Sequence, residues 1–340
     1  MSDDSTSITA GQTDPVALLF PGQGSQAPGM GKLVLEHSEA ARRTYQEASE
    51  IAHMDVARIC FELDDEGLTE TNITQPAILT TSIALAAAMR EKLADVGRLM
   101  HPRLFGGHSL GLFSAAVSAE ALEFRDAMLV IIERARLMSS FNKDRPVGMA
   151  TIVGLDGDAV RNICEQSTHS PLDRVDVANL NMDTQTTISG DVSALERAME
   201  RARELQGKVF RLKVKVSSHT PLHAAQAEAF ADVLQDVAFK SPKRPIISNI
   251  TSQPLSTAEA LRDEFAAQLR SPVYWASNVQ EMARHGVDTF VEAGPGHVLA
   301  RLVRRISRSA TAVSLADATE EPIPISILPA GATASPASAQ

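Results

Sequence analysis

The sequence predicts an α/β protein with two parts, a large domain built on a parallel sheet and a small inserted domain with the βαββαβ order of the ferredoxin-like arrangement. Short apolar runs at residues 16–20 and 104–106 indicate the large domain, because each ends in a glycine-rich turn and precedes a helical pattern. A change of pattern between residues 147 and 216 indicates the small one. A chain of 340 residues is long enough for both.

The large domain is expected to occupy residues 16–146 and 217–315. The polar residues 1–15 are predicted to be a flexible lead, and the Ala-, Pro-, Ser- and Thr-rich residues 316–340 a disordered tail. After the strand at residues 16–20, we expect helices at 33–52, 77–94 and 123–141, with a polar turn at 68–76. The second part is predicted to contain a helix to about residue 236, a strand at 246–250, a helix that opens at 271–275 and a strand from 289.

The small domain is predicted at residues 147–216. Its expected elements are a strand at 149–154, a helix at 157–166, strands at 175–180 and 185–189, a helix at 193–206 and a strand at 208–216. In the last strand Arg211, Lys213 and Lys215 alternate with apolar residues. One face of this strand is therefore expected to be basic and the other buried.

Composition excludes several classes of protein. The net charge of −10 argues against nonspecific binding of nucleic acid. Two cysteines, Cys60 and Cys164, have no metal-binding spacing and form no disulfide framework, which suits a reducing cytoplasm. We expect no metal, no signal peptide and no membrane segment, and hence a soluble cytoplasmic protein.

The motif Gly107-His108-Ser109-Leu110-Gly111 lies between a predicted strand and a predicted helix. Gly-x-Ser-x-Gly in that context is the nucleophile elbow of α/β-hydrolase-like domains, in which the serine hydroxyl is held at a helix N-terminus. The alternative is a glycine-flanked turn with an idle serine. The flanking strand and helix favour the nucleophile.

A serine nucleophile needs a base, and the chain has nine histidines. His219 is favoured modestly over His297 and His223, because it ends a strand directly before a Thr-Pro pair. His108 is expected to flank the nucleophile. Arg134 falls on the apolar stripe of the predicted helix 123–141, where periodicity alone favours a side chain that snorkels to the edge.

Six motifs together resemble the malonyl-CoA:acyl carrier protein transacylases and the acyltransferase domains of polyketide synthases. The similarity spans roughly residues 16–308, and we expect a discrete acyltransferase. The motifs occur in the family's order: Phe20-Pro21-Gly22-Gln23-Gly24-Ser25-Gln26, Thr74-Gln75-Pro76-Ala77, Gly107-His108-Ser109-Leu110-Gly111, Ser218-His219-Thr220-Pro221-Leu222, Ser271-Pro272-Val273-Tyr274-Trp275 and Glu292-Ala293-Gly294-Pro295-Gly296.

The resemblance implies a role for each matching residue. Ser109 would carry the acyl group as an ester, and His219 would be its general base. Asn249 matches the asparagine near the carbonyl that orients the histidine in this family. The remaining implied roles are the oxyanion hole, from the backbone N–H groups of Gln23 and Leu110, and the acyl site, from Gln75, His108 and Arg134, whose guanidinium pairs with the free carboxylate of a malonyl-type group.

Three positions depart from the family's usual pattern. Leu112 stands where an acidic residue is usual, His223 stands in place of methionine, and residues 216–219 match neither the malonyl nor the methylmalonyl signature of polyketide domains. The preferred acyl group therefore stays open. For His223 a packing replacement is favoured over tuning of the base.

The implied substrates are malonyl-CoA or a related coenzyme A thioester and an acyl carrier protein with phosphopantetheine, and no bound cofactor is expected. Basic residues that could dock an acidic carrier are Arg301, Arg304, Arg305 and Arg308, or the face formed by Arg211, Lys213 and Lys215. Solvated charge is the alternative for both. Two rival functions are an acyl hydrolase, which has no use for a buried Arg134, and a noncatalytic docking module.

Overall fold

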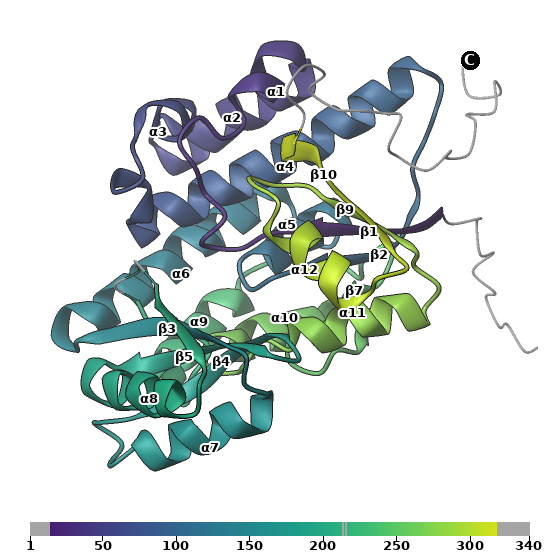
Figure 1. The fold of residues 1–340 in the computed structure, drawn as a ribbon. Helices are drawn as coiled ribbons and strands as arrows, with labels where there is room; N and C mark the ends of the chain where they lie inside the picture. The colour runs from purple at the N-terminus through teal and green to yellow at the C-terminus, as the bar shows by residue number, and fades with distance from the viewer. Residues whose placement is uncertain (1–13, 213, 215, 318–340) are drawn as a thin grey trace, which may run out of the picture.

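The computed structural model describes residues 14–212, 214 and 216–317. Its larger part is built on a six-stranded sheet (Figure 1). Five neighbouring strands of this sheet run parallel, and the sixth, at one edge, is antiparallel. This confirms the predicted α/β class. In spatial order the strands are β10 (Thr311–Ser314), β9 (Thr289–Glu292), β1 (Asp14–Phe20), β2 (Pro102–Gly107), β7 (Ile246–Ile247) and β8 (Pro254–Leu255).

Helices cover both faces of this sheet, because alternate side chains of β1 enter two separate cores. Leu18 and Phe20 enter the larger core, whereas Ala17 and Leu19 enter the smaller one on the opposite face. The larger core is formed with α1 (Lys32–His37), α2 (Glu39–Ala52), α3 (Val56–Glu62), α4 (Thr71–Asp95), α5 (Gly111–Ser118), α6 (Phe124–Asp144), α9 (Ala224–Gln235) and α10 (Ala258–Gln268). The smaller core is formed with α11 (Trp275–Arg284) and α12 (Val298–Ile306).

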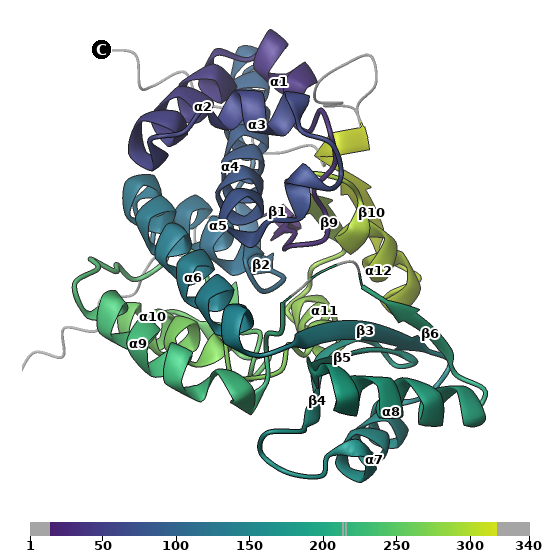
Figure 2. The ribbon, with the colours of Figure 1, turned by 90° about the vertical axis from the view of Figure 1, so that its left-hand side faces the viewer.

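The smaller part of the molecule is an antiparallel sheet with the strand order β4-β5-β3-β6 (Figure 2). Two helices pack on one face of it around a core that includes Ile152, Ile163 and Leu195. Along the chain its elements are β3 (Val147–Val153), α7 (Gly157–Ser167), β4 (Val175–Met182), β5 (Gln185–Asp191), α8 (Val192–Glu204) and β6 (Lys208–Arg211). This is the predicted βαββαβ order, and the face without helices is free to meet the larger part.

Two helical predictions differ from the structure. Residues 33–52 form two helices rather than one, because the Ser38 hydroxyl accepts a hydrogen bond from the Ala41 N–H (3.0 Å) and so caps a new helix. Helix α4 begins at Thr71, so most of the predicted polar turn is helical and includes Pro76. A proline this close to a helix start removes one hydrogen bond, and the burial of its neighbours outweighs that loss.

Two strands are shorter than predicted. Strand β6 ends at Arg211 and β7 ends at Ile247. After β7 the Ser248 hydroxyl accepts hydrogen bonds from the N–H groups of Ile250 and Thr251 (3.0 and 2.8 Å), which turns the chain out of the sheet.

The ends of the chain are only partly described. Strand β1 begins at Asp14, and a 3-10 helix occupies Leu315–Asp317. The rest of the predicted lead and tail, residues 1–13 and 318–340, lies outside the described residues. Among the residues that are described, no helix combines the length and the apolar character needed to cross a bilayer.

Candidate active site

The turn between β2 and α5 places Ser109 directly before Leu110, the N-cap of that helix. Ser109 has a φ of 52°, a left-handed conformation that is uncommon for a residue with a side chain. The flanking glycines are required by close packing. A Cβ atom on Gly107 would lie 2.1 Å from the backbone of Gly111, and one on Gly111 would lie 2.0 Å from the carbonyl oxygen of Phe20.

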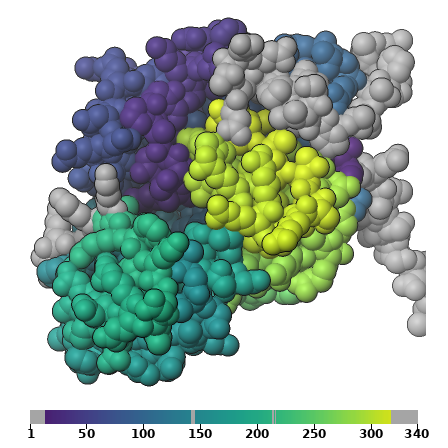
Figure 3. Space-filling model, viewed as in Figure 1, coloured from purple at the N-terminus to yellow at the C-terminus, as the bar shows by residue number. Residues whose placement is uncertain are grey.

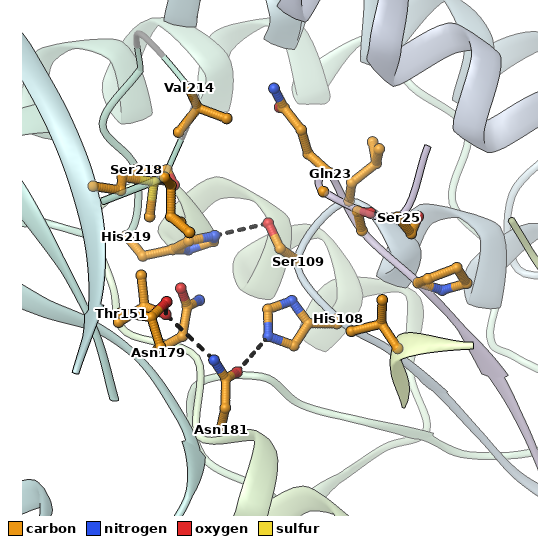
Figure 4. Close-up of a pocket in the computed structure, with 18 of the residues that line it drawn as sticks. Gln23, Ser25, His108, Ser109, Thr151, Asn179, Asn181, Val214, Ser218 and His219 are labelled. Carbon is orange, nitrogen blue, oxygen red and sulfur yellow. Dashed lines mark hydrogen bonds between the residues drawn. The ribbon is translucent and has the colours of Figure 1, made fainter. Parts of the chain in front are cut away.

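Ser109 and His219 meet across the interior, although 110 positions separate them in the chain (Figure 4). The distance from Ser109 Oγ to His219 Nε2 is 2.7 Å. On the other side of the ring, Nδ1 donates to the carbonyl oxygens of Gln268 (2.9 Å) and Ser271 (3.2 Å). Because a carbonyl oxygen only accepts, Nδ1 carries the proton and Nε2 is left to accept one from Ser109.

The imidazole of His219 is held in its neutral form. Burial lowers the pKa of His219 to about 3, and the positive charge of Arg134 acts in the same direction. His219 has a φ of 61° and is almost fully buried. A neutral histidine beside a serine hydroxyl is the state that can remove the hydroxyl proton.

Asn249 has a different position from the one that the resemblance implies. Asn249 makes no hydrogen bond to His219 in the described structure. Instead its Oδ1 accepts from the Ser109 N–H (2.7 Å), and its Nδ2 donates to the Gly107 carbonyl (2.7 Å). Asn249 therefore braces the nucleophile turn, while the Gln268 and Ser271 carbonyls orient the imidazole. Glu264 holds Asn249 in turn, because its carboxylate accepts from the Asn249 N–H (2.8 Å).

The backbone N–H groups of Gln23 and Leu110 are the candidate donors for an oxyanion hole. Gln23 and Leu110 both line the cleft that contains Ser109, and the Leu110 N–H lies at the N-terminus of α5. Across the described part of the chain, neither N–H has a hydrogen-bond acceptor. Unpaired donors at a helix N-terminus favour negative charge beside the nucleophile.

Arg134 does not snorkel to the surface. It is 2% exposed, and its Nη2 lies 3.3 Å from Ser109 Oγ. Its other partners are the side-chain oxygens of Gln75 (2.9 Å) and Gln268 (3.3 Å), both neutral. Within the described residues, its Nε has no partner. Burial lowers the pKa of Arg134 to about 10, so a cation without a counter-ion lies at the nucleophile.

The cleft around these residues has a volume of about 610 Å³ and is lined by residues of both the larger and the smaller part. In Figure 3 the smaller part is the teal and green region at the lower left. His108 flanks Ser109, as predicted from the motif. Its Nε2 lies 3.0 Å from Asn181 Oδ1 of β4, and its ring packs against Trp275 with centroids 5.5 Å apart. Three arginines, Arg134, Arg301 and Arg305, line the cleft with no aspartate or glutamate among the described lining residues.

Comparison with known proteins identifies the family of this chain. The model of the acyl transferase domain family matches residues 17–321. The chain belongs to this family. It is 37% identical over 306 residues to the malonyl CoA-acyl carrier protein transacylase of Bacillus subtilis strain 168. The alignment covers 89% of this chain and 93% of the relative. A Staphylococcus aureus transacylase of the same name is 31% identical over 88% of this chain and 94% of its own length.

Solved structures of the family agree with the fold. The malonyl-CoA:acyl carrier protein transacylase of Xanthomonas oryzae superposes with a TM-score of 0.84 at 32% identity, covering 90% of this chain and 96% of that one. A malonyl-transacylase in complex with a type II polyketide synthase acyl-carrier protein gives 0.83 at 31% identity, covering 89% and 96%. The resemblance that the six motifs indicate is thereby confirmed.

Two of this acyl transferase's departures from the family pattern lie in buried positions. Leu112 is fully buried in the larger core. His223 is also fully buried. Its Nε2 lies 2.7 Å from the Ser217 hydroxyl, and its ring packs against Phe141 with centroids 4.4 Å apart.

The basic residues predicted to dock a carrier protein separate into two groups. Arg301 and Arg305 line the cleft. Arg304 does not, because its guanidinium donates twice to the Ala312 carbonyl (3.1 and 2.7 Å) and so ties α12 to β10. Arg211 pairs with Glu196 of α8, on the helix side of the small sheet and away from the cleft. Lys213 and Lys215 lie outside the described residues.

Gln268 and Glu264 are site residues that the sequence analysis missed. Both lie on α10, within no recognised motif. Gln268 contacts three parts of the site: its backbone carbonyl accepts from His219, its Oε1 accepts from Arg134, and its Nε2 donates to the Ser109 carbonyl (3.1 Å). No local signal marks such a residue, because its partners come from three distant segments.

Proposed function

We propose that this chain moves a malonyl group from coenzyme A to the phosphopantetheine thiol of an acyl carrier protein, the activity in the names of its relatives. The observation that carries the proposal is the buried guanidinium of Arg134, 3.3 Å from the Ser109 hydroxyl and surrounded by neutral side chains. A malonyl group brings the missing counter-ion, since its free carboxylate lies only two bonds from the thioester carbonyl. An acyl group without a free carboxylate, such as acetyl, brings no such charge.

In the first half of the reaction, Ser109 Oγ attacks the thioester carbonyl carbon while His219 Nε2 takes the hydroxyl proton. The carbonyl oxygen becomes an oxyanion, and the N–H groups of Gln23 and Leu110 stabilise it. Loss of one such donor costs about 3 kcal/mol of transition-state stabilisation. As the tetrahedral intermediate collapses, the C–S bond breaks, coenzyme A leaves as a thiol with the proton from His219, and a malonyl ester remains on Ser109.

In the second half, the carrier thiol enters and gives its proton to His219 Nε2. The sulfur attacks the ester carbonyl, the same oxyanion site is used, and Ser109 Oγ leaves with the proton returned by His219. Because the imidazole is neutral in the free protein, its Nε2 can accept a proton in each half of the reaction. The reaction uses side chains and backbone groups of this chain only, and coenzyme A enters as part of a substrate.

Arg134 gives the acyl site its selectivity. Gln75 holds one guanidinium nitrogen and Gln268 the other, so the cation is oriented before a substrate arrives. A carboxylate that replaces these weaker acceptors makes charge-assisted, bidentate hydrogen bonds with the guanidinium. An acetyl group leaves the buried charge unpaired, and the same penalty applies to the neutral chains of an acyl hydrolase.

The thioester chemistry suits a reducing cytoplasm, where we place this activity. Cys60 and Cys164 are both free and buried, as expected for a protein that keeps its thiols reduced.

The proposal is tested by incubating the protein with radiolabelled malonyl-, methylmalonyl- or acetyl-CoA and isolating the labelled ester. Carrier protein or buffer alone is then added. We expect a malonyl ester that passes to the carrier faster than it hydrolyses, and no label on the Ser109→Ala variant. Release to water as fast as to the carrier would instead support the hydrolase, and labelling of the alanine variant would exclude Ser109 as the nucleophile.

A further inference from the structure

The outer part of strand β6 forms one side of the cleft mouth. Phe210 lies directly opposite Thr151 in the antiparallel pairing of β6 with β3. Opposite residues of such a pair project from the same face of a sheet, and Thr151 lines the cleft. Phe210 is therefore on the cleft face, where it is 56% exposed. Leu212 and Val214, which follow it, continue this apolar surface down the cleft wall.

The first turns of α12 form the other side of the mouth (Figure 3). Val298 lines the cleft and is 45% exposed. Arg301 and Arg305 lie one and two turns further along the helix, also line the cleft and are exposed. Within the described residues, no salt bridge engages either arginine. The two sides thus present exposed apolar groups, and one of them adds two cations.

The charge of this surface differs from that of the whole chain. The protein carries a net charge of −10, but the described lining of the cleft has arginines and no carboxylates. A partner that fits this mouth must bring negative charge to α12 and an apolar surface to Phe210. It must also send a thiol between the two sides to Ser109.

We propose that an acidic carrier protein docks across both sides of the cleft mouth, with apolar side chains on Phe210 and Val298 and carboxylates against Arg301 and Arg305. This inference rests on the proposed function. It differs from docking on the arginine segment alone in two respects: the small sheet contributes an apolar anchor, and Arg304 contributes nothing, because its guanidinium is committed to β10.

The test compares Phe210→Glu with Leu172→Glu, a matched change on the same part of the molecule. Leu172 is 80% exposed in the loop between α7 and β4 and does not line the cleft. Three rates are measured: acylation of Ser109 by malonyl-CoA, transfer to the intact carrier protein, and transfer to free pantetheine. Arg301→Glu and Arg304→Gln are measured alongside.

For Phe210→Glu and Arg301→Glu, we expect the KM for the carrier protein to rise at least about tenfold, as for loss of an interface anchor. Transfer to pantetheine should stay within about twofold of wild type for both variants, and acylation by malonyl-CoA should do so for Phe210→Glu. Leu172→Glu and Arg304→Gln should resemble wild type in all three rates. Raising the salt concentration should weaken carrier binding by the wild type.

Three outcomes would overturn the inference: an unchanged carrier KM for Phe210→Glu, an equal rise for Leu172→Glu, or an equal loss of transfer to pantetheine. A wild-type protein that sediments as a dimer and becomes a monomer on Phe210→Glu would assign this face to a second copy of the chain instead. Failure of Ser109 to become acylated at all would contradict the proposed function, so the two proposals fail in different measurements.

Discussion

The guanidinium of Arg134 lies 3.3 Å from the hydroxyl of Ser109, the atom on which an acyl ester would form. Helix α6 supplies the first residue and the β2–α5 turn the second. In a buried site, a cation this close to the nucleophile attracts an anionic acyl group and also disfavours protonation of the neighbouring base. We therefore expect Arg134 to affect both the choice of acyl group and the protonation of His219.

Replacement of Arg134 by alanine should reduce loading of malonyl groups by about a hundredfold or more, since a charge-assisted pair in a buried site is lost. Loading of acetyl groups should fall by less than about tenfold. The measurement is single-turnover labelling of Ser109 with each thioester. Equal losses for both groups would show that Arg134 does not recognise the carboxylate.

A glutamate at position 268 should have a similar effect without removal of the cation. The Gln268 side-chain oxygen lies 3.3 Å from Arg134 Nη2, so Gln268→Glu places an internal carboxylate where the malonyl carboxylate would bind. Malonyl loading should fall by about tenfold or more, while acetyl loading changes little. Gln268→Met is the matched control, because it removes the hydrogen bonds without adding charge. If both variants lose malonyl loading equally, charge is not the cause.

The acylation rate should begin to fall only at a pH well below the one at which an ordinary histidine becomes protonated. Because the pKa of His219 is lowered to about 3, its imidazole stays neutral and active as the pH falls through 6 and 5. The rate of acylation by acetyl-CoA should therefore be nearly flat from pH 8 to pH 5. Arg134→Met removes a charge that lowers this pKa, so its acid limb should move to higher pH. A wild-type profile that declines around pH 6.5 would contradict this prediction.

Asn249 is predicted to stabilise both the fold and the nucleophile turn. Asn249→Ala leaves the Ser109 N–H and the Gly107 carbonyl without partners in a buried place, at a cost of about 2–4 kcal/mol in the free energy of unfolding. The rate of acylation should fall as well. Urea denaturation and labelling of Ser109 measure the two effects, and Asn278→Ala on α11 is a control for loss of another buried asparagine. Unaltered acylation in a destabilised Asn249→Ala variant would limit Asn249 to a structural role.

The Ser217–His223 pair should behave as a unit in stability measurements. His223→Met leaves the buried Ser217 hydroxyl without its 2.7 Å partner, and should destabilise the protein by about 1–3 kcal/mol. Ser217→Ala leaves the buried His223 Nε2 without its partner in the same way, and His223 Nδ1 already lacks a partner among the described residues. The double variant should recover most of the loss, because both polar groups are replaced together. Strictly additive losses in urea denaturation would contradict this coupling.

Much of the fold could be predicted from the sequence because its signals are local. Apolar runs that end in glycine-rich turns mark the parallel strands. In the small domain, apolar residues recur with a period of two in the strands and of 3.6 in the helices. The elements that escaped prediction have two causes, distant packing in one case and a local side-chain hydrogen bond in the other. Residues 71–76 joined α4 because that segment is buried by tertiary packing, and β7 ended at Ile247 because the side chain of Ser248 turns the chain.

The same division holds within the site. The sequence by itself determined the nucleophile turn around Ser109, since glycine spacing and a following helix are local features, and its six motifs determined the family. Only the tertiary structure decided that Arg134 is buried, that Asn249 braces the turn rather than His219, that Gln268 joins three segments, and that Arg304 faces β10. Periodicity gives the face of a helix on which a residue lies, but the partner of a buried polar group depends on which distant segment packs against that face.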